Sequence, residues 1–201
     1  MPKCQYCSRP AWYRVRTSGE FLCPGHSRIE VRGTLCSSRR PPALQVSAAR
    51  KADEKVILMM WDRFWDDDEM DCFGSSFKAT EVPALLARDG ERTVGILSYA
   101  VQREEDALNI VSLSVLPEYQ GRGAAREMIA ALEDEALRLG MGRLIVATSN
   151  DNPLALYAYQ RLGFRITSIQ VGVIEPDRPD EAHHGFAGIP VRDEIQLEKR
   201  L

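Results

Sequence analysis

The chain has 201 residues, of which 44% are hydrophobic, and a formal net charge of −3 at pH 7. These values are ordinary for a globular protein with one domain of about 150 residues and a short additional module. No apolar stretch approaches the roughly 20 residues that span a bilayer, and the polar, cysteine-containing start lacks the apolar core of a signal peptide. We therefore expect neither a membrane protein nor a secreted one, and the expected location is cytoplasmic.

The charge is distributed unevenly along the chain. Residues 1–40 contain eight Lys or Arg against two Asp or Glu, whereas the remaining residues contain 18 against 27. Such asymmetry indicates different surroundings for the two parts. Nucleic acid would suit the basic part, but we do not favour this partner because a solvated basic linker has the same composition.

The first predicted element is a zinc-ribbon-like module over residues 1–30. Two pairs of potential ligands, fifteen residues apart, have the spacing of metal knuckles: Cys4 with Cys7, and Cys23 with His26. Thiolate and imidazole groups suit tetrahedral Zn²⁺, and a module of this size needs the metal for its stability. Cys36 is the alternative to His26 as the fourth ligand. Four protein ligands make the zinc structural rather than catalytic.

The segment between the ligand pairs is predicted to form a hairpin. Residues 11–16 partly alternate between apolar and polar, residues 17–20 are typical of a turn, and Phe21 and Leu22 begin the return strand. Residues 31–42 are rich in Arg, Ser, Gly and Pro, so we interpret them as a linker to a larger domain over residues 43–201. Cys72 in that domain is predicted to be a small buried side chain rather than a nucleophile.

The larger domain is predicted to contain both strands and helices. In chain order, we expect a strand at 43–48, a helix at 51–64, an acidic interruption at 66–71, strands at 82–87, 93–101 and 108–116, a helix at 124–139, a strand at 144–148, a helix at 153–162, and strands at 164–173 and 195–197. Turns are expected at Asp89-Gly90 and at residues 104–106. The first strands form an antiparallel meander, and the fold class is α/β (α+β).

A glycine-rich turn connects the meander to the long helix. The strand ends at Pro117, and Gly121 and Gly123 follow just before the helix begins. Backbone N–H groups of residues 121–126 would then converge at the positive end of the helix dipole, which is how many proteins bind phosphate. Arg122 and Arg126 either add positive charge to this site or only form the solvated start of the helix.

Two motifs give the domain a family resemblance. Gln120, Gly123 and Ala125 match the Q/R-x-x-G-x-G/A pyrophosphate signature of the GNAT superfamily of acyl-CoA-dependent N-acyltransferases. About thirty residues later, residues 152–164 are similar to the family's N-x-x-A-x-x-x-Y-x-x-x-G-F motif. The resemblance covers roughly residues 44–201. It implies the GNAT fold, a mixed and mostly antiparallel central sheet flanked by helices, with acetyl-CoA as cosubstrate.

The resemblance also implies roles for particular residues. The implied cofactor-binding residues are Leu113, Val115, Gln120, Gly121, Arg122, Gly123, Ala124, Ala125, Arg126, Asn152, Ala155 and Tyr159. Tyr159 matches the family tyrosine that protonates the leaving thiolate, and Asn152 is at the same time the expected N-cap of its helix. Tyr157 should point to the opposite side of that helix and serve packing.

The proton acceptor is the least defined part of the predicted site. Many family members have a glutamate on the strand before the glycine turn, about where Asn109 stands here. Either Glu104, Glu105 or Asp106 acts through water, or the amine arrives already neutral. The alternative for these three carboxylates is that they are only turn residues. We include Glu105 and Asp106 in the predicted catalytic set.

The acceptor side is predicted from aromatic and acidic residues. The family's acceptor-side helices usually lie at the place in the chain that holds Trp61, Trp65 and the acidic residues 66–69. Carboxylates beside aromatic rings suit a cationic amine. The alternative is a solvated acidic loop over core tryptophans. His183 and His184 would line the acceptor cleft from the opposite side.

The predicted function is transfer of an acetyl group from acetyl-CoA to a primary amine of a small molecule or a protein. Transfer would be direct, in a ternary complex, by a monomer or homodimer. The alternative is a catalytically weak acyl-CoA-binding domain whose zinc ribbon binds nucleic acid or protein. Asn109 in place of a carboxylate favours this alternative, and the two intact motifs count against it.

Overall fold

The computed structural model describes residues 13–14, 21–22, 44–65, 67–174 and 185–201. All predicted zinc ligands lie outside these residues: Cys4, Cys7, Cys23, His26 and the alternative Cys36. Within them, β1 (Tyr13–Arg14) pairs antiparallel with β2 (Phe21–Leu22), in agreement with the predicted hairpin. None of the helices described is long and apolar enough to cross a membrane.

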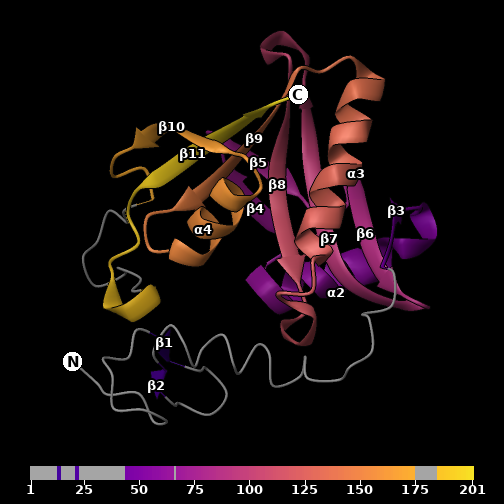
Figure 1. The fold of residues 1–201 in the computed structure, drawn as a ribbon, viewed down its shortest axis with the longest axis horizontal. Coiled ribbons are helices and arrows are strands. Elements are labelled where there is room, and N and C mark those ends of the chain that lie inside the picture. The colour runs from indigo at the N-terminus through magenta and orange to yellow at the C-terminus, as the bar shows by residue number, and fades with distance from the viewer. Residues whose placement is uncertain (1–12, 15–20, 23–43, 66, 175–184) are drawn as a thin grey trace.

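A seven-stranded sheet forms the centre of the larger domain, in the order β10-β11-β9-β8-β7-β6-β3 (Figure 1). Its strands are β3 (Gln45–Ala48), β6 (Ala84–Asp89), β7 (Arg92–Gln102), β8 (Ala107–Val115), β9 (Arg143–Ser149), β10 (Arg165–Gln170) and β11 (Glu194–Arg200). Neighbouring strands of this sheet are antiparallel except for β8 and β9, which are parallel. The predicted mixed, mostly antiparallel sheet is confirmed.

Helices lie on both faces of this sheet. The helices of the described residues are η1 (Lys51–Asp53), α2 (Glu54–Trp65), η2 (Arg103–Glu105), η3 (Pro117–Tyr119), α3 (Ala124–Leu139), α4 (Pro153–Arg161) and η5 (Phe186–Gly188). Trp61 of α2 donates a hydrogen bond to Ser98, whereas the next residue, Tyr99, donates one to Glu135 of α3. Because consecutive strand residues point to opposite faces, α2 and α3 lie on opposite sides of β7, as Figure 1 also shows.

Helix α3 has the limits and the buried face that its periodicity predicts. It follows Gly123 and ends at Gly140, both with positive φ, and Met128, Ile129 and Leu132 are almost completely buried. Complete burial of each such side chain contributes about 1.5–3 kcal/mol. The packing against β7 is close, since a Cβ on Gly95 would lie 2.9 Å from the Met128 Cε atom. This contact fixes the position of α3, and with it the glycine turn.

The parallel strands β8 and β9 separate beside a bulge. Ile110 and Ser112 pair with the consecutive residues Tyr99 and Ser98, so Val111 is an extra residue in β8. The pairing of β8 with β9 ends at Ile110 and Val146. A bulge bends its strand and increases the local twist. The C-terminal part of β8 therefore diverges from β9, and its backbone groups on that side face a wedge-shaped opening.

One hairpin was not predicted. Strands β4 (Glu69–Cys72) and β5 (Ser75–Lys78) pair antiparallel through a two-residue turn, where we expected only an acidic interruption. Both turn residues, Phe73 and Gly74, have positive φ (54° and 69°), as the favoured two-residue hairpin turn requires. A phenylalanine is unusual in that backbone conformation. The sequence therefore lacked the Asn-Gly or Asp-Gly signal that marks such turns.

Candidate active site

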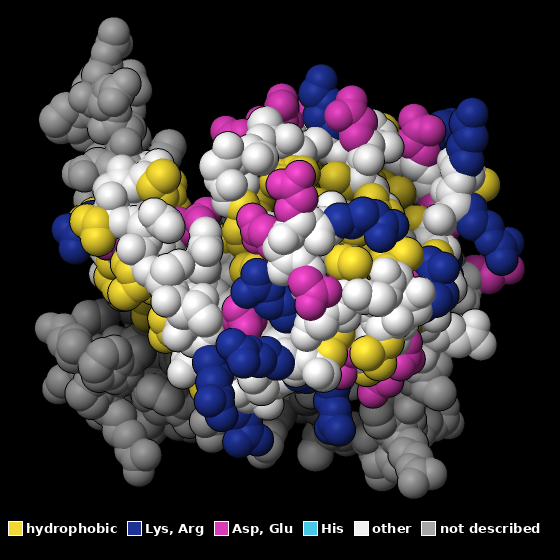
Figure 2. Space-filling view, turned by 90° about the horizontal axis from the view of Figure 1, so that it is seen from above, with side chains coloured by type: hydrophobic (Ala, Val, Ile, Leu, Met, Phe, Trp, Pro, Cys, Tyr) yellow, Lys and Arg dark blue, Asp and Glu magenta, His cyan; other side chains and the backbone are white. Residues whose placement is uncertain are grey.

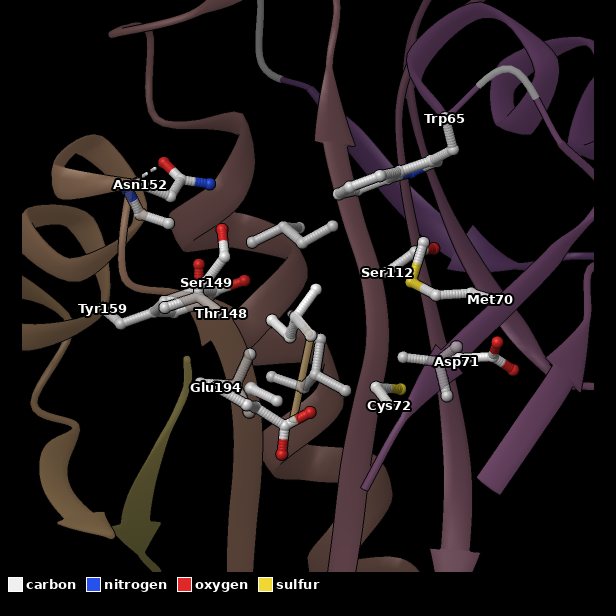
Figure 3. A pocket seen from close by; sticks show the side chains of 17 residues that line it. Trp65, Met70, Asp71, Cys72, Ser112, Thr148, Ser149, Asn152, Tyr159 and Glu194 are labelled. Atoms are coloured by element: carbon white, nitrogen blue, oxygen red, sulfur yellow. Dashed lines mark hydrogen bonds between the residues drawn. The ribbon is translucent and has the colours of Figure 1, made fainter. Parts of the chain in front are cut away.

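A cavity of about 310 Å³ occupies the opening between β8 and β9. Its walls are residues 110–113 of β8, residues 146–149 of β9 and one side of α4. The end of α2, strand β4, Ile174 and the first residue of β11 complete it (Figure 3). The cavity thus connects the α4 side of the sheet with the side that carries α2 and the β4–β5 hairpin.

Three residues of the predicted second motif line the cavity from α4. They are Asn152, Ala155 and Tyr159, and Leu113 of β8 lies in the same lining. Asn152 caps the helix, because its side-chain oxygen accepts a hydrogen bond from the Ala155 backbone N–H at 3.1 Å. The structure therefore brings these four predicted cofactor-binding residues together, and it gives Asn152 its predicted capping role.

Tyr159 is held rigidly in the wall of the cavity. Its side chain is 7% exposed, and its ring packs edge-on against Phe164, with 5.5 Å between the ring centroids. Burial raises the pKa of the Tyr159 hydroxyl, so the phenol remains protonated over the neutral range. Tyr157 points to the opposite side of α4, as predicted, but it is 58% exposed and does not pack in the core.

The glycine turn lies directly beyond the C-terminal end of β8. Gly121 and Gly123 have φ values of 72° and 94°, and the first hydrogen bond of α3 joins the Glu127 N–H to the Gly123 carbonyl. The N–H groups of residues 124–126 precede that bond and have no carbonyl partner within the helix. The Gln120 side-chain amide donates to the Val115 carbonyl at 3.1 Å and so ties the turn to β8.

Charged side chains border this turn. The Arg122 guanidinium lies 5.2 Å from the centroid of the Tyr119 ring, and the Tyr119 hydroxyl donates to Asp89 at 2.8 Å. Arg126 follows in the exposed first turn of α3. Free N–H groups, two glycines with positive φ and adjacent guanidinium groups form a suitable anion site.

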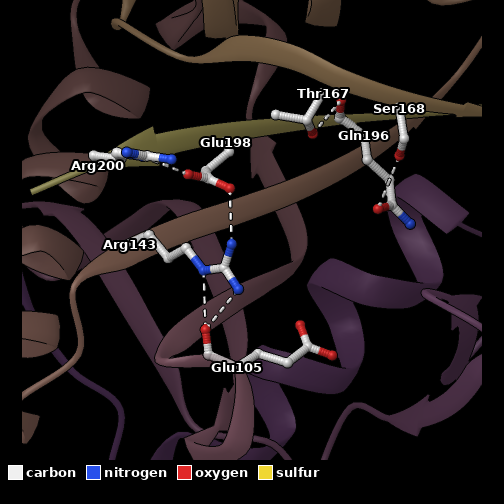
Figure 4. A network of polar contacts seen from close by, with 7 residues as sticks. All are labelled: Glu105, Arg143, Thr167, Ser168, Gln196, Glu198 and Arg200. Carbon is white, nitrogen blue, oxygen red and sulfur yellow. Dashed lines mark hydrogen bonds and ion pairs between the residues drawn. The ribbon is translucent and has the colours of Figure 1, made fainter.

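Glu105 and Asp106 do not lie at the cavity. They stand at the N-terminal end of β8, where the Asp106 carboxylate accepts the Gly142 N–H at 2.9 Å and the Glu105 carbonyl accepts two bonds from Arg143 (Figure 4). At about 3.3 Å per residue, Asp106 is roughly 16 Å from the extra residue Val111 of the bulge. Lys, Arg, Asp and Glu side chains are interspersed over that end of the molecule (Figure 2). These two residues connect η2 to β9, and the structure gives no support for their predicted catalytic role.

The predicted acceptor residues divide between core and cavity. Trp61 is completely buried, and its indole N–H donates to the Ser98 hydroxyl at 3.2 Å, so it belongs to the core. Trp65 is 45% exposed and lines the cavity. Of the predicted acidic residues 66–69, those that the structure describes, 67–69, do not line the cavity, and Asp67 accepts the backbone N–H groups of the two residues that follow it. Asp71, which was not among the predicted acceptor residues, is in the lining. His183 and His184 lie outside the described residues.

Cys72 lines the cavity as a half-buried thiol. Burial raises its pKa to about 12, and the nearby charges of Glu194 and Asp71 add to this effect. Since the thiolate is the nucleophilic form of cysteine, Cys72 is not an activated nucleophile at neutral pH. The thiol is therefore not a nucleophile, as predicted, but it is half-buried in the cavity wall rather than fully buried.

Glu194 is a cavity residue that was not among the predicted site residues. This residue begins β11, lines the cavity and is 8% exposed. One carboxylate oxygen accepts from the Gln196 side-chain amide at 2.9 Å, and the other accepts from the Phe73 backbone N–H at 3.4 Å. No local motif marks Glu194. Its place in the site follows from the insertion of β11 between β9 and β10, which only the topology shows.

Comparisons with known proteins agree with this geometry. The sequence model of the acetyltransferase (GNAT) family matches residues 52–164. The chain is 27% identical over 150 residues to the uncharacterised protein YxbD of Bacillus subtilis (strain 168), covering 73% of this chain and 92% of that protein. It is 26% identical over 140 residues to the L-amino acid N-acyltransferase MnaT of Escherichia coli (strain K12), covering 62% of this chain and 81% of that protein.

The fold is likewise similar to solved structures. A GNAT family acetyltransferase from Elizabethkingia anophelis with acetyl-CoA bound superimposes with a TM-score of 0.61 and 20% identity, covering 79% of this chain and 98% of that chain. At that level of identity the likeness concerns the fold, which includes the central sheet and its flanking helices.

Proposed function

Because the chain belongs to the GNAT acetyltransferase family, we propose that it transfers an acetyl group from acetyl-CoA to a primary amine. The observation that carries this proposal is the continuity of the site. The cavity between β8 and β9, with Tyr159 in its wall, is lined by β8 as far as Leu113, and β8 ends two residues later, just before the glycine turn that starts α3. A long thioester with phosphates at one end and an acyl group at the other fits such a path.

The residues present suit acetyl-CoA at both ends. At the phosphate end, residues 124–126 supply N–H groups, and a Cβ on Gly123 would meet nothing within 4 Å, so the space beside it is open to a ligand. At the acyl end, Leu113, Asn152, Ala155 and Tyr159 line the cavity. The backbone of β8 beyond the bulge has no pairing with β9 and can donate hydrogen bonds to the pantetheine chain.

In the proposed reaction, the amine nitrogen attacks the thioester carbonyl carbon directly. The new C–N bond forms, the C–S bond breaks, and the Tyr159 hydroxyl gives its proton to the departing thiolate. The raised pKa of Tyr159 keeps that proton in place until the thiolate forms. Direct transfer is favoured over an acetyl-cysteine intermediate because Cys72 remains a thiol at neutral pH.

Two measurements on the whole protein test the proposed function. Acetyl-CoA at 100 times its dissociation constant should stabilise the fold by about 2.7 kcal/mol, visible as a thermal shift. An acetylation assay over a panel of primary amines should then find acceptors. No shift at millimolar acetyl-CoA would refute the proposal. A shift without acetylation of any amine would favour the alternative of a catalytically weak acyl-CoA-binding domain.

We also propose that Cys4, Cys7, Cys23 and His26 bind a structural zinc ion. Protein purified without chelators should contain one zinc per chain, and Cys4→Ser should lose it while acetyl-CoA binding persists. Metal analysis by mass spectrometry checks the first point, and calorimetry with acetyl-CoA the second. If zinc persists in His26→Ala but is lost in Cys36→Ala, the fourth ligand is Cys36 and not His26. Metal-free protein would overturn the proposal.

A further inference from the structure

Glu194 and Asn109 lie on the same face of the sheet. Asn109 pairs with Ala100 of β7, two residues from Ser98, which α2 contacts. Across β9, Asn109 is opposite Ile145, and Ile145 is opposite Glu198 of β11. Residues opposite each other share a face, as do residues four apart in one strand. Glu194 is therefore on the α2 side, about 13 Å further along the strands, where β8 and β9 have separated.

The charge of the site is divided between its two ends. Asp71 and Glu194 are the charged residues of the cavity lining, and none of the described lining residues is a Lys, Arg or His. Glu194 is buried, whereas Asp71 is exposed and alternates along β4 with Met70 and Cys72, so its carboxylate points away from Glu194 (Figure 3). Both charges help to raise the pKa of the Cys72 thiol. The half-buried Arg122 of the glycine turn and the exposed Arg126 of the first turn of α3 lie at the other end. The cavity end thus favours a cationic ligand, and the turn an anionic one.

The hydrogen bonds of Glu194 leave capacity for a ligand. A carboxylate has about four acceptor positions, and one of the two bonds that it accepts, from the Phe73 N–H, is long at 3.4 Å. On the same face, Ser112 lines the cavity, is 3% exposed, and its hydroxyl has no hydrogen-bond partner. Buried hydroxyls are nearly always paired in folded proteins. A ligand with several N–H donors would provide the missing partner.

We propose that Glu194 binds the acceptor as an ammonium ion and takes its first proton, so that it supplies the carboxylate that the chain lacks at Asn109. The acceptor class is then a cationic primary amine without a carboxylate of its own beside the amine. This inference rests on the proposed acetyl transfer. Glu194 takes one proton from the ammonium, and the neutral amine attacks the thioester. The nitrogen then loses a second proton, which replaces the one that Tyr159 gives to the thiolate. The products are the amide, CoA thiol and one proton.

The first test uses the unmodified protein and matched acceptors. 3-Methylbutylamine and leucine differ by a carboxylate two bonds from the amine, and the alkylamine is the more basic of the two, so a larger free-amine fraction cannot explain a preference for it. With the Glu194 carboxylate in the cavity lining, kcat/KM for the alkylamine should exceed that for the amino acid at least tenfold, because like charges repel at short distance. Equal rates, or a preference for leucine, would overturn the inference while leaving acetyl transfer itself intact. A protein that acetylates neither of these nor any other amine refutes both.

The second test uses Glu194→Gln, which keeps the size of the side chain. For an alkylamine at neutral pH, kcat/KM should fall about 100-fold or more. For trifluoroethylamine, which is already neutral at that pH, the loss should be less than tenfold. The titratable groups that line the cavity together with Glu194 are Asp71 and Cys72 on β4 and Tyr159 on α4. In the variant, log kcat/KM for the alkylamine should rise with a slope of about 1 per pH unit, because only the free amine reacts.

Glu198→Gln is the matched control. Glu198 is on the same strand and face but pairs with Arg143 at 2.9 Å and lies outside the cavity lining. Its replacement should change neither the alkylamine rate nor the slope. Equal losses for both amines in Glu194→Gln would indicate a structural effect and overturn the proton transfer. If that variant does not fold, the comparison of 3-methylbutylamine with leucine still decides the charge preference.

Discussion

Replacing Gly123 with glutamate is expected to weaken acetyl-CoA binding at least 100-fold, as measured by calorimetry. Gly123 has a φ of 94°, and a Cβ there would meet no protein atom within 4 Å. The added side chain would therefore enter the open space beside the start of α3, where we propose that the phosphates lie. Its carboxylate would also place a negative charge beside them, which costs several kcal/mol. A 100-fold loss of affinity corresponds to about 2.7 kcal/mol.

Backbone strain is the competing explanation for such a loss. A side chain in the left-handed region costs about 1–2 kcal/mol, and Gly123→Ala measures this part without the charge. Gly140→Ala is the matched control, since Gly140 has a φ of 73°, also has no atom near its Cβ position, and lies at the other end of α3. Gly140→Ala should lower stability but not affinity. An unchanged dissociation constant in folded Gly123→Glu would refute the assignment of the anion site.

Local signals were sufficient for the elements that frame the cofactor side. Helix α3 could be predicted residue for residue because apolar residues recur with helical spacing between Gly123 and Gly140. Helix α4 could be placed because Asn152 and Pro153 mark its start. Asn152, Ala155 and Tyr159 of its predicted motif line the cavity together, because a regular helix places positions three and four apart on one side.

The acceptor side could not be predicted because it depends on long-range topology. Glu105 and Asp106 are close to Asn109 in sequence, but they lie at the end of β8 away from the bulge. Proximity in sequence does not tell which end of a strand carries the site. Glu194 is 85 positions after Asn109 in the numbering and reaches the same face only because β11 inserts beside β9. Long-range pairings of this kind have no local pattern.

The bulge in β8 illustrates the same limit. The sequence predicts one regular strand over residues 108–116, and nothing in it singles out Val111 as an extra residue. Its effect is nevertheless large, because the pairing of β8 with β9 ends beside it and the cavity opens there. A strand that is buried on both of its faces has a continuous apolar sequence without alternation. Its register and its irregularities therefore cannot be recognised from the sequence.

Replacing Tyr159 with phenylalanine is expected to lower kcat by about 100- to 10,000-fold, the usual contribution of general acid catalysis. The change removes only the hydroxyl. The ring should keep its edge-on contact with Phe164, so the fold and the affinity for acetyl-CoA should change little. Because burial raises the pKa of Tyr159, the hydroxyl is protonated at neutral pH, and the loss should persist across that range. Steady-state kinetics with a saturating amine separates kcat from KM.

Tyr157→Phe is the control for this prediction, because it makes the same chemical change two residues away on the same helix. Tyr157 is 58% exposed and lies outside the cavity lining, so its hydroxyl contacts no reacting atom. We expect kcat in this variant to stay close to that of the unmodified protein. Equal losses in the two variants would indicate that α4 itself is disturbed. Full activity in Tyr159→Phe would mean that the thiolate leaves unprotonated or that another acid serves it, and Tyr159 would then be only a packed side chain in the wall of the cavity.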